Sequence, residues 1–161
     1  MKLWLKFLLF LVPALLGTWF VLWRFSPGQA VLRRAALVFT SVEKGTLSAG
    51  SPRDKAQRLE EVLAPALEIR GPHPVPSGAL SSAQVGRMLV EFQNSILSCQ
   101  ISREDETVEF PTEEQAVYRA LLSAETAKGP GRTYHMRYRC RIEFRRSGRA
   151  WLATLIELEA I

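Results

Sequence analysis

The chain has 161 residues and a formal net charge of +5, which is enough length for one domain with its own core and too little for two ordinary ones. Lys2, Lys6 and Arg24 flank an apolar N-terminal segment, so the rest of the chain has eighteen Lys and Arg (21 minus 3) against all sixteen Asp and Glu. A net charge of +2 on that remainder gives no electrostatic reason to expect a nucleic-acid partner.

The N-terminal segment has the composition of a membrane-spanning helix. Residues 7–23 contain no ionisable side chain, and Trp4 and Trp23 stand near the two ends of the apolar stretch, as tryptophans do at membrane interfaces. At a rise of about 1.5 Å per residue, a helix over residues 3–23 crosses roughly 30 Å of hydrocarbon. We therefore predict that the lipid bilayer is a partner of the chain through residues 3–23.

Two other interpretations of this segment stay open. A cleaved secretion signal also begins with lysines and an apolar run, although residues 17–23 are bulky where the signal peptidase requires small side chains. A buried hairpin is the other. If residues 1–24 are a retained anchor, the short tail before it favours a cytoplasmic N-terminus. The domain of residues 25–161 would then be extracytoplasmic, and periplasmic in a bacterium.

Three helices are expected in the first half of the chain. Each has a start signal with Ser as the N-cap, at residues 26–29, 51–54 and 81–84. A short strand near residues 68–70 and a loop rich in Pro and Gly at residues 71–78 separate the second helix from the third. Apolar residues follow each signal at helical spacing: Val31, Ala35, Val38 and Val42; Leu59, Val62, Leu63 and Leu67; Val85, Met88, Leu89, Phe92 and Ile96.

The second half of the chain has the two-residue period of β-strands. Apolar and charged side chains alternate over residues 134–145, which predicts a long strand with one buried face. Residues 146–149 are a tight turn, and residues 151–158 are the partner strand of a hairpin. Residues 98–110 and 115–124 are expected as two earlier strands, although the composition of the latter also suits a helix.

The closing hairpin carries a resemblance to a known family. Its turn contains Gly148, Trp151 follows closely, and the element order from Gln29 onward is that of the nuclear transport factor 2-like (SnoaL-like) superfamily, which the chain resembles. Leu152 departs from the basic residue that many members have after the tryptophan. The resemblance implies a cone-shaped domain of about three helices packed on a curved antiparallel sheet of three to four long strands. With the transmembrane helix predicted from residues 3–23 in front of it, the expected fold class is α+β.

The resemblance also implies an apolar pocket inside the cone, which some members use for catalysis. Phe92, Met136 and Tyr138 are the candidate pocket-lining residues. His135 and Cys140 cannot pair, because they are an odd number of residues apart and point to opposite faces of a strand. No histidine and cysteine spacing fits a metal, and no catalytic motif occurs. The sequence therefore predicts no catalytic residue, no cofactor and no metal site.

Two acidic clusters, at residues 104–106 and 113–114, are expected to be solvated turns rather than paired catalytic carboxylates. Cys99 and Cys140 fall in or beside predicted strands. One interpretation is that both are buried free thiols. In an oxidising compartment they could instead form a disulfide, provided that the two Cα atoms are close.

Arginines recur on one face of the strand predicted over residues 134–145. Arg137, Arg139 and Arg141 are expected about 7 Å apart. One interpretation is a solvated face neutralised by Glu157, Glu159 or other acids on neighbouring strands. The other is a docking face for an acidic protein or for anionic lipid headgroups. No aromatic side chain is interleaved with these arginines, so a base-stacking platform for nucleic acid is missing.

These patterns predict a membrane-anchored, non-catalytic binding or assembly module, for which self-association is one option. The alternative is a small enzyme of the isomerase or hydrolase type that uses the apolar interior of the cone. A structural domain without a ligand is a third interpretation.

Overall fold

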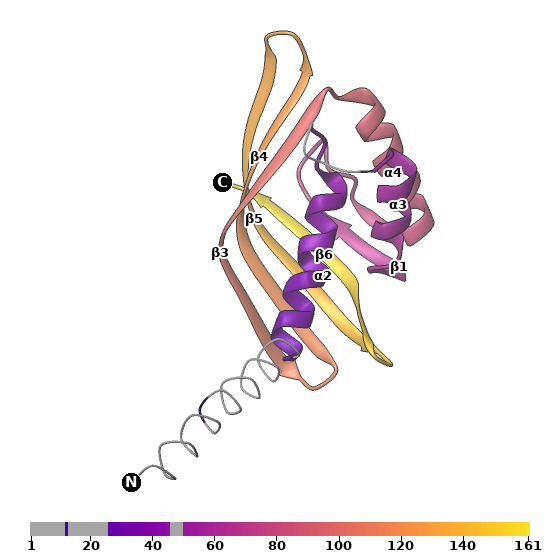
Figure 1. Ribbon diagram of the computed structural model, residues 1–161, viewed down its shortest axis with the longest axis vertical. Helices are drawn as coiled ribbons and strands as arrows, with labels where there is room; N and C mark the ends of the chain where they lie inside the picture. The colour runs from indigo at the N-terminus through magenta and orange to yellow at the C-terminus, as the bar shows by residue number, and fades with distance from the viewer. Residues whose placement is uncertain (1–11, 13–25, 46–49) are drawn as a thin grey trace, which may run out of the picture. The chain divides into compact units, whose positions relative to one another are not determined.

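The computed structural model describes residues 12, 26–45 and 50–161. The chain divides into two compact units, residues 1–30 and 31–161, and all the described strands belong to the second (Figure 1). The described helices are α2 (Pro27–Val42), α3 (Pro52–Glu60) and α4 (Ser82–Ser95). The strands are β1 (Leu63–Arg70), β2 (Gly78–Ser81), β3 (Ser98–Thr112), β4 (Gln115–Gly129), β5 (Arg132–Ser147) and β6 (Ala150–Ala160).

The strands form one sheet in the order β2-β1-β6-β5-β4-β3. All neighbours are antiparallel except β1 and β6, which are parallel. Figure 1 shows the four long strands curving, with α2 lying along one side of them. The α+β architecture and the curved sheet are confirmed, and the four long strands are joined by two short ones, β1 and β2.

Two of the predicted helix starts are confirmed by complete capping boxes. The Ser51 hydroxyl accepts a hydrogen bond from the Asp54 amide, while the Asp54 carboxylate accepts one from the Ser51 amide. The Ser51 hydroxyl also donates to the Asp54 carboxylate at 2.8 Å. This bond first, and then the one from the Ser51 amide, lowers the pKa of the Asp54 carboxyl. Ser81 and Gln84 form the same reciprocal pair at the start of α4. Each box satisfies amide groups that a helix start would otherwise leave without a partner.

The predicted end of the second helix is wrong. Helix α3 ends at Glu60, and Leu63 and Leu67 lie on β1 instead of on a helical stripe. The stretch from Leu63 to Glu68, where the register of β1 on β6 shifts, contains Pro65, which cannot donate to a sheet ladder and is usual at such irregularities. The short strand expected near residues 68–70 is confirmed and begins earlier.

Two polar side chains, one buried and one half-buried, close the carboxyl ends of α2 and α4. The Gln93 side chain is 1% exposed, and its amide nitrogen donates to the carbonyl of Ser41 at 2.8 Å. The Lys44 ammonium donates to the carbonyls of Gln93 at 2.5 Å and Ile96 at 2.7 Å. Donors of this kind satisfy the last carbonyls of a helix, and a cation also complements its dipole. These contacts hold the end of α2 against α4.

The predicted strands of the second half are confirmed and extended at their ends. On β5, the alternation produces a buried face that consists of Tyr138, Cys140, Ile142 and Phe144. Ile142 pairs with Tyr118 on β4 and with Ile156 on β6. This face lines the inner side of the sheet.

The predicted anchor over residues 3–23 lies outside the described residues, apart from Val12. Among the residues that are described, no helix has both the length and the apolar character needed to cross a membrane.

Candidate functional site

A β-bulge in β3 turns one carboxylate toward the inner side of the sheet. Glu104 pairs with Leu121 and Thr107 with Arg119, so two residues, Asp105 and Glu106, face the single residue between them on β4. Asp105 has φ 53°, in the left-handed region that aspartate tolerates better than most residues. The additional residue reverses the alternation, which places Glu106 on the inner face.

Glu106 meets two other polar side chains there. The Tyr118 hydroxyl donates to Glu106 Oε2 at 2.8 Å, and Arg103 Nη1 lies 3.6 Å from the same oxygen. We call Arg103, Glu106 and Tyr118 the inner trio. Phe39 of α2 covers it, with its ring centroid 5.9 Å from that of Tyr118 and 5.8 Å from the guanidinium carbon of Arg103. The trio thus connects β3, β4 and α2.

The environment of the Tyr118 hydroxyl keeps it protonated. Tyr118 is 0% exposed, and burial first, then the hydrogen bond to Glu106, raises the pKa of its hydroxyl. The phenol is therefore a protonated donor at neutral pH and the carboxylate is its acceptor. The side chains of Arg103 and Glu106 are 28% and 31% exposed, so they can still meet a polar group from solvent. The arrangement suits Tyr118 as a donor that holds the Glu106 carboxylate in place better than as a group that transfers a proton.

The candidate pocket residues lie on two elements. Tyr138 is buried on β5 and its hydroxyl donates to the Met136 sulfur at 2.9 Å, while Phe92 is half-buried on α4. Burial raises the pKa of the Tyr138 hydroxyl. Met136 and Tyr138 are thus in contact, and a pocket shared with Phe92 stays a prediction.

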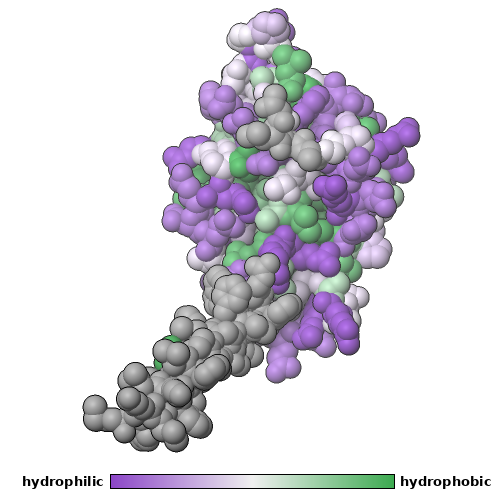
Figure 2. Space-filling view, in the orientation of Figure 1, coloured by the Kyte–Doolittle hydropathy of each residue, from purple (hydrophilic) through white to green (hydrophobic). Residues whose placement is uncertain are grey.

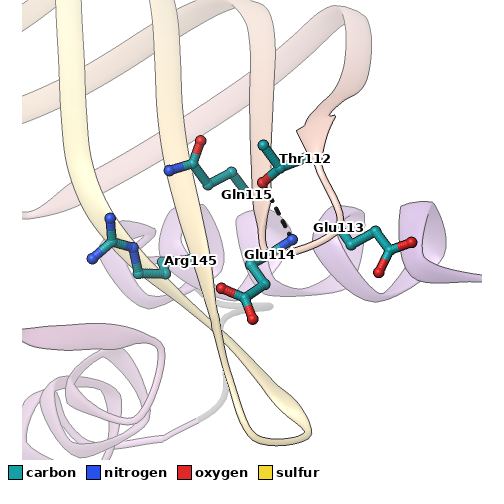
Figure 3. A pocket seen from close by; sticks show the side chains of 5 residues that line it. All are labelled: Thr112, Glu113, Glu114, Gln115 and Arg145. Carbon is teal, nitrogen blue, oxygen red and sulfur yellow. Dashed lines mark hydrogen bonds between the residues drawn. The ribbon is translucent and has the colours of Figure 1, made fainter.

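A surface hollow lies elsewhere, at the turn between β3 and β4 (Figure 3). The residues around it are all exposed: Thr112, Glu113, Glu114, Gln115 and Arg145. The Glu114 amide donates to Thr112 Oγ1 at 3.3 Å. The prediction of a solvated turn is confirmed for residues 113–114. For residues 104–106 the predicted turn is wrong, because they lie within β3, although all three are exposed as expected. Glu106 among them belongs to the inner trio.

The predicted arginine face is paired with acids. Arg139 and Glu159 approach to 2.8 Å, Arg141 and Glu157 to 3.3 Å, and Arg137 and Glu104 to 4.0 Å. Arg141 also pairs with Glu143. Beyond these, Arg119 pairs with Glu109 at 2.7 Å and Arg70 with Glu68 at 2.8 Å. The geometry matches the neutralised interpretation of this face, and its role in docking stays a prediction.

The two cysteines are free and buried, so the disulfide considered above is not formed. Cys99 on β3 pairs with Thr126, whereas Cys140 on β5 pairs with Ala120. The two thiols therefore lie on opposite neighbours of β4 and six residues apart along it, roughly 20 Å. A disulfide needs Cα atoms within about 7 Å. Burial raises the pKa of the Cys99 thiol and raises that of Cys140 to about 12.

Sequence patterns missed the inner trio. Strict alternation from the buried Cys99 puts Arg103 and Asp105 on the inner face and Glu106 on the outer one. The bulge reverses this, and its only signal in the sequence is an aspartate in the acidic run, a residue type that tolerates the left-handed conformation.

No protein-family model and no curated protein matches the sequence. Solved structures do match. The Kfla4162 protein from Kribbella flavida has a TM-score of 0.70 at 11% identity, over 82% of this chain and 88% of that one. A dehydratase candidate of the NTF2-like family from Streptomyces avermitilis has a TM-score of 0.64 at 13% identity, over 83% and 94%.

The CaMKII hub from S. rosetta also matches, with a TM-score of 0.63 at 11% identity, over 84% of this chain and 98% of that one. One fold therefore serves a dehydratase candidate and a kinase hub. Identities this low carry the fold and no residue role. The described domain has the nuclear transport factor 2-like fold.

Proposed function

We propose that the chain is a membrane-anchored, non-catalytic assembly module. Residues 1–24 hold it in the bilayer with the N-terminus in the cytoplasm, and residues 25–161 form an extracytoplasmic domain that associates with a second copy. The observation that carries the proposal is that the protein's own side chains fill the centre of the inner side of the sheet.

The filling is tight where a ligand-binding cone would be hollow. Tyr118, Cys140 and Ile142 are 0% exposed, and Phe144 is 1% exposed. Phe39 lies over Tyr118, whose hydroxyl is already bonded to Glu106. A substrate could reach that hydroxyl only if this packing opened, which costs apolar contacts.

The outer face of the sheet supports self-association. Its arginines alternate with glutamates from β1, β3, β5 and β6, so the face carries both signs of charge over a short distance. Across a two-fold axis, a patch of this kind is complementary to itself, because the arginine of one copy can meet a glutamate of the other. A basic face without acids would repel its own copy.

The proposal is tested by the mass of the full chain in mild detergent, measured by light scattering. We expect a dimer or a larger assembly. Arg139→Glu should weaken it, because the reversed charge at residue 139 repels Glu159 instead of attracting it. The matched control is Arg53→Glu, an exposed position on α3 that should leave the mass unchanged. A monomeric wild-type chain at micromolar concentration would contradict self-association.

Orientation needs a separate measurement. A topology reporter fused after Ile161 should be active on the extracytoplasmic side, and the chain should resist extraction by alkaline carbonate. A reporter that is active only in the cytoplasm would show the opposite orientation. Release of the chain by carbonate would contradict the anchor.

One observation favours the enzyme alternative. Glu106 and Arg103 are partly exposed on the inner face, beside aromatic rings, as polar groups in binding sites often are. Glu106→Gln separates the two options through thermal stability. Loss of stability assigns the trio to structure, whereas unchanged or raised stability is typical of a functional carboxylate.

A further inference from the structure

The six arginines of residues 137–149 separate into two groups in the structure. Arg137, Arg139 and Arg141 on the sheet face all pair with acids. The arginines at the turn from β5 to β6 are exposed, and among the residues that the structure describes none of them has an ion pair: Arg145, Arg146 and Arg149. We call these three the turn arginines. The unneutralised positive charge thus lies at the turn and not on the face.

The turn holds these arginines at one end of the sheet. Gly148, with φ 60°, closes the tight connection between β5 and β6, a conformation that glycine adopts without strain. The Arg146 amide donates to the Glu114 carbonyl at 2.8 Å, which joins this turn to the one between β3 and β4. In Figure 2 the side chains at this end of the domain are predominantly hydrophilic.

From Val31, where the domain unit begins, α2 runs away from this end of the sheet. Its last residues lie near the other end of the sheet, where Lys44 bridges to Cys99, and Phe39 packs on Tyr118 in between. Two further helical turns toward the N-terminus, about 12 Å, bring α2 to the level of the β3–β4 turn. The domain unit therefore begins, at Val31, at the end that carries the turn arginines.

Chain length connects this end to the bilayer. Trp23, the end of the proposed anchor, and Val31 are eight Cα-to-Cα steps apart, with seven residues between them. Even a fully extended chain of that length spans only about 28 Å. If residues 3–23 span the bilayer, the end of the domain that carries the turn arginines is thus the end to which this short tether is attached.

We infer that the turn arginines bind anionic phospholipid headgroups and so fix the orientation of the domain on the bilayer. This inference rests on the anchor in the proposed function. Three guanidinium groups at one turn suit phosphate oxygens, which they can bind in pairs. Basic residues next to a membrane span contribute electrostatic attraction to anionic lipid, roughly fivefold in affinity for each. Two acids in the adjoining turn, Glu113 and Glu114, weaken that attraction without cancelling it.

The test uses the full chain in vesicles of phosphatidylcholine alone or mixed equally with phosphatidylglycerol. A fluorophore on Ser147→Cys reports the turn, and quencher lipids labelled at the headgroup report contact. The control site is Pro130→Cys in the β4–β5 turn. Cys99 and Cys140 are 3% and 0% exposed, so the parent chain should take up little dye. Flotation with phosphatidylcholine vesicles tests the anchor independently.

We expect quenching at residue 147 in the mixed vesicles, at least about fivefold stronger than in phosphatidylcholine, and little at residue 130. Raising the salt from about 0.1 M to about 1 M should abolish it, because the screening length falls from roughly 10 Å to 3 Å. Replacing the three turn arginines by Gln should also abolish it. Glu113→Gln with Glu114→Gln should strengthen it, and this second variant keeps the arginines intact if the first fails to fold.

A chain that floats but shows equal quenching in both kinds of vesicle overturns the headgroup inference and leaves the anchor standing. Persistence of the signal without the turn arginines overturns it as well. A chain that does not float with phosphatidylcholine vesicles removes the anchor, and with it the reason to expect this contact.

Discussion

Arginine–glutamate pairs occupy both sides of the sheet, in very different surroundings. On the inner side, Arg103 and Glu106 are 28% and 31% exposed, and Glu106 accepts a hydrogen bond from the buried Tyr118. On the outer side, Arg139 and Glu159 are 62% and 67% exposed and have water around them. Water screens the outer pairs, whereas the inner pair lies in a less polar medium in which charges interact more strongly. The comparison teaches that surroundings, not contact distance, decide what a pair contributes.

The largest effect should come from the apolar packing beside the inner trio. Phe144→Ala removes a side chain that is 1% exposed, so it should lower the free energy of unfolding by about 3–5 kcal/mol. Phe110→Ala is the control, because that ring is 41% exposed although it contacts Trp151. In urea unfolding, the loss of unfolding free energy should be several-fold larger for Phe144→Ala than for Phe110→Ala. Equal losses would mean that the inner side is not the core.

Alternation made the strands of this domain predictable. Tyr138, Cys140, Ile142 and Phe144 take every second position on β5, and each is buried as that period requires. The helix starts were predictable because a capping box is a local arrangement of four residues. The sequence period predicts burial correctly wherever one face of a helix or strand is buried along its whole length.

Tertiary pairing decides the features that the sequence did not predict. The inner trio depends on the bulge at Asp105 and on the partner register of β4, neither of which is a property of a single strand. The pairing of Arg139 with Glu159 was one of two interpretations of the arginine face, and the register of β5 on β6 decides for it. The end of α3 was misplaced because Leu63 and Leu67 suit a helical stripe as well as a buried strand.

Alkaline pH should lower the stability of the fold through groups buried on the inner side of the sheet, and not through the exposed pairs on the outer side. Burial raises the pKa of the Cys140 thiol from 9.0 to about 12, so the folded state holds a proton that the unfolded state releases. The resulting stability is complete below pH 9.0 and is lost as pH rises toward 12, with a slope of up to about 1.4 kcal/mol per pH unit. Cys140→Ala should make the urea midpoint less dependent on pH between these limits. If the midpoint of the variant falls with pH as steeply as that of the wild type, this thiol is not the cause.

The hydroxyl of Tyr118 should contribute less than the packing of its ring. Tyr118→Phe keeps the ring and leaves Glu106 without its donor, which should cost about 1–3 kcal/mol. Tyr134→Phe, at a position 48% exposed, provides the matched control and should be nearly neutral. Thermal and urea unfolding measure both. A neutral Tyr118→Phe would show that water or Arg103 replaces the lost donor at no cost.

The smallest effect should come from the outer pairs, and a double-mutant cycle on Arg139 and Glu159 measures it. Replacing each by Gln, singly and together, should give a coupling energy of about 0.2–1 kcal/mol. That coupling should shrink in about 1 M salt, because both groups are exposed and the screening length is then roughly 3 Å. The same cycle on Arg103 and Glu106 should give a larger coupling that salt reduces less. If the outer coupling equals the inner one at high salt, burial does not distinguish the two sides of the sheet. If it grows when the chain is assembled, Arg139 and Glu159 belong to the interface between copies.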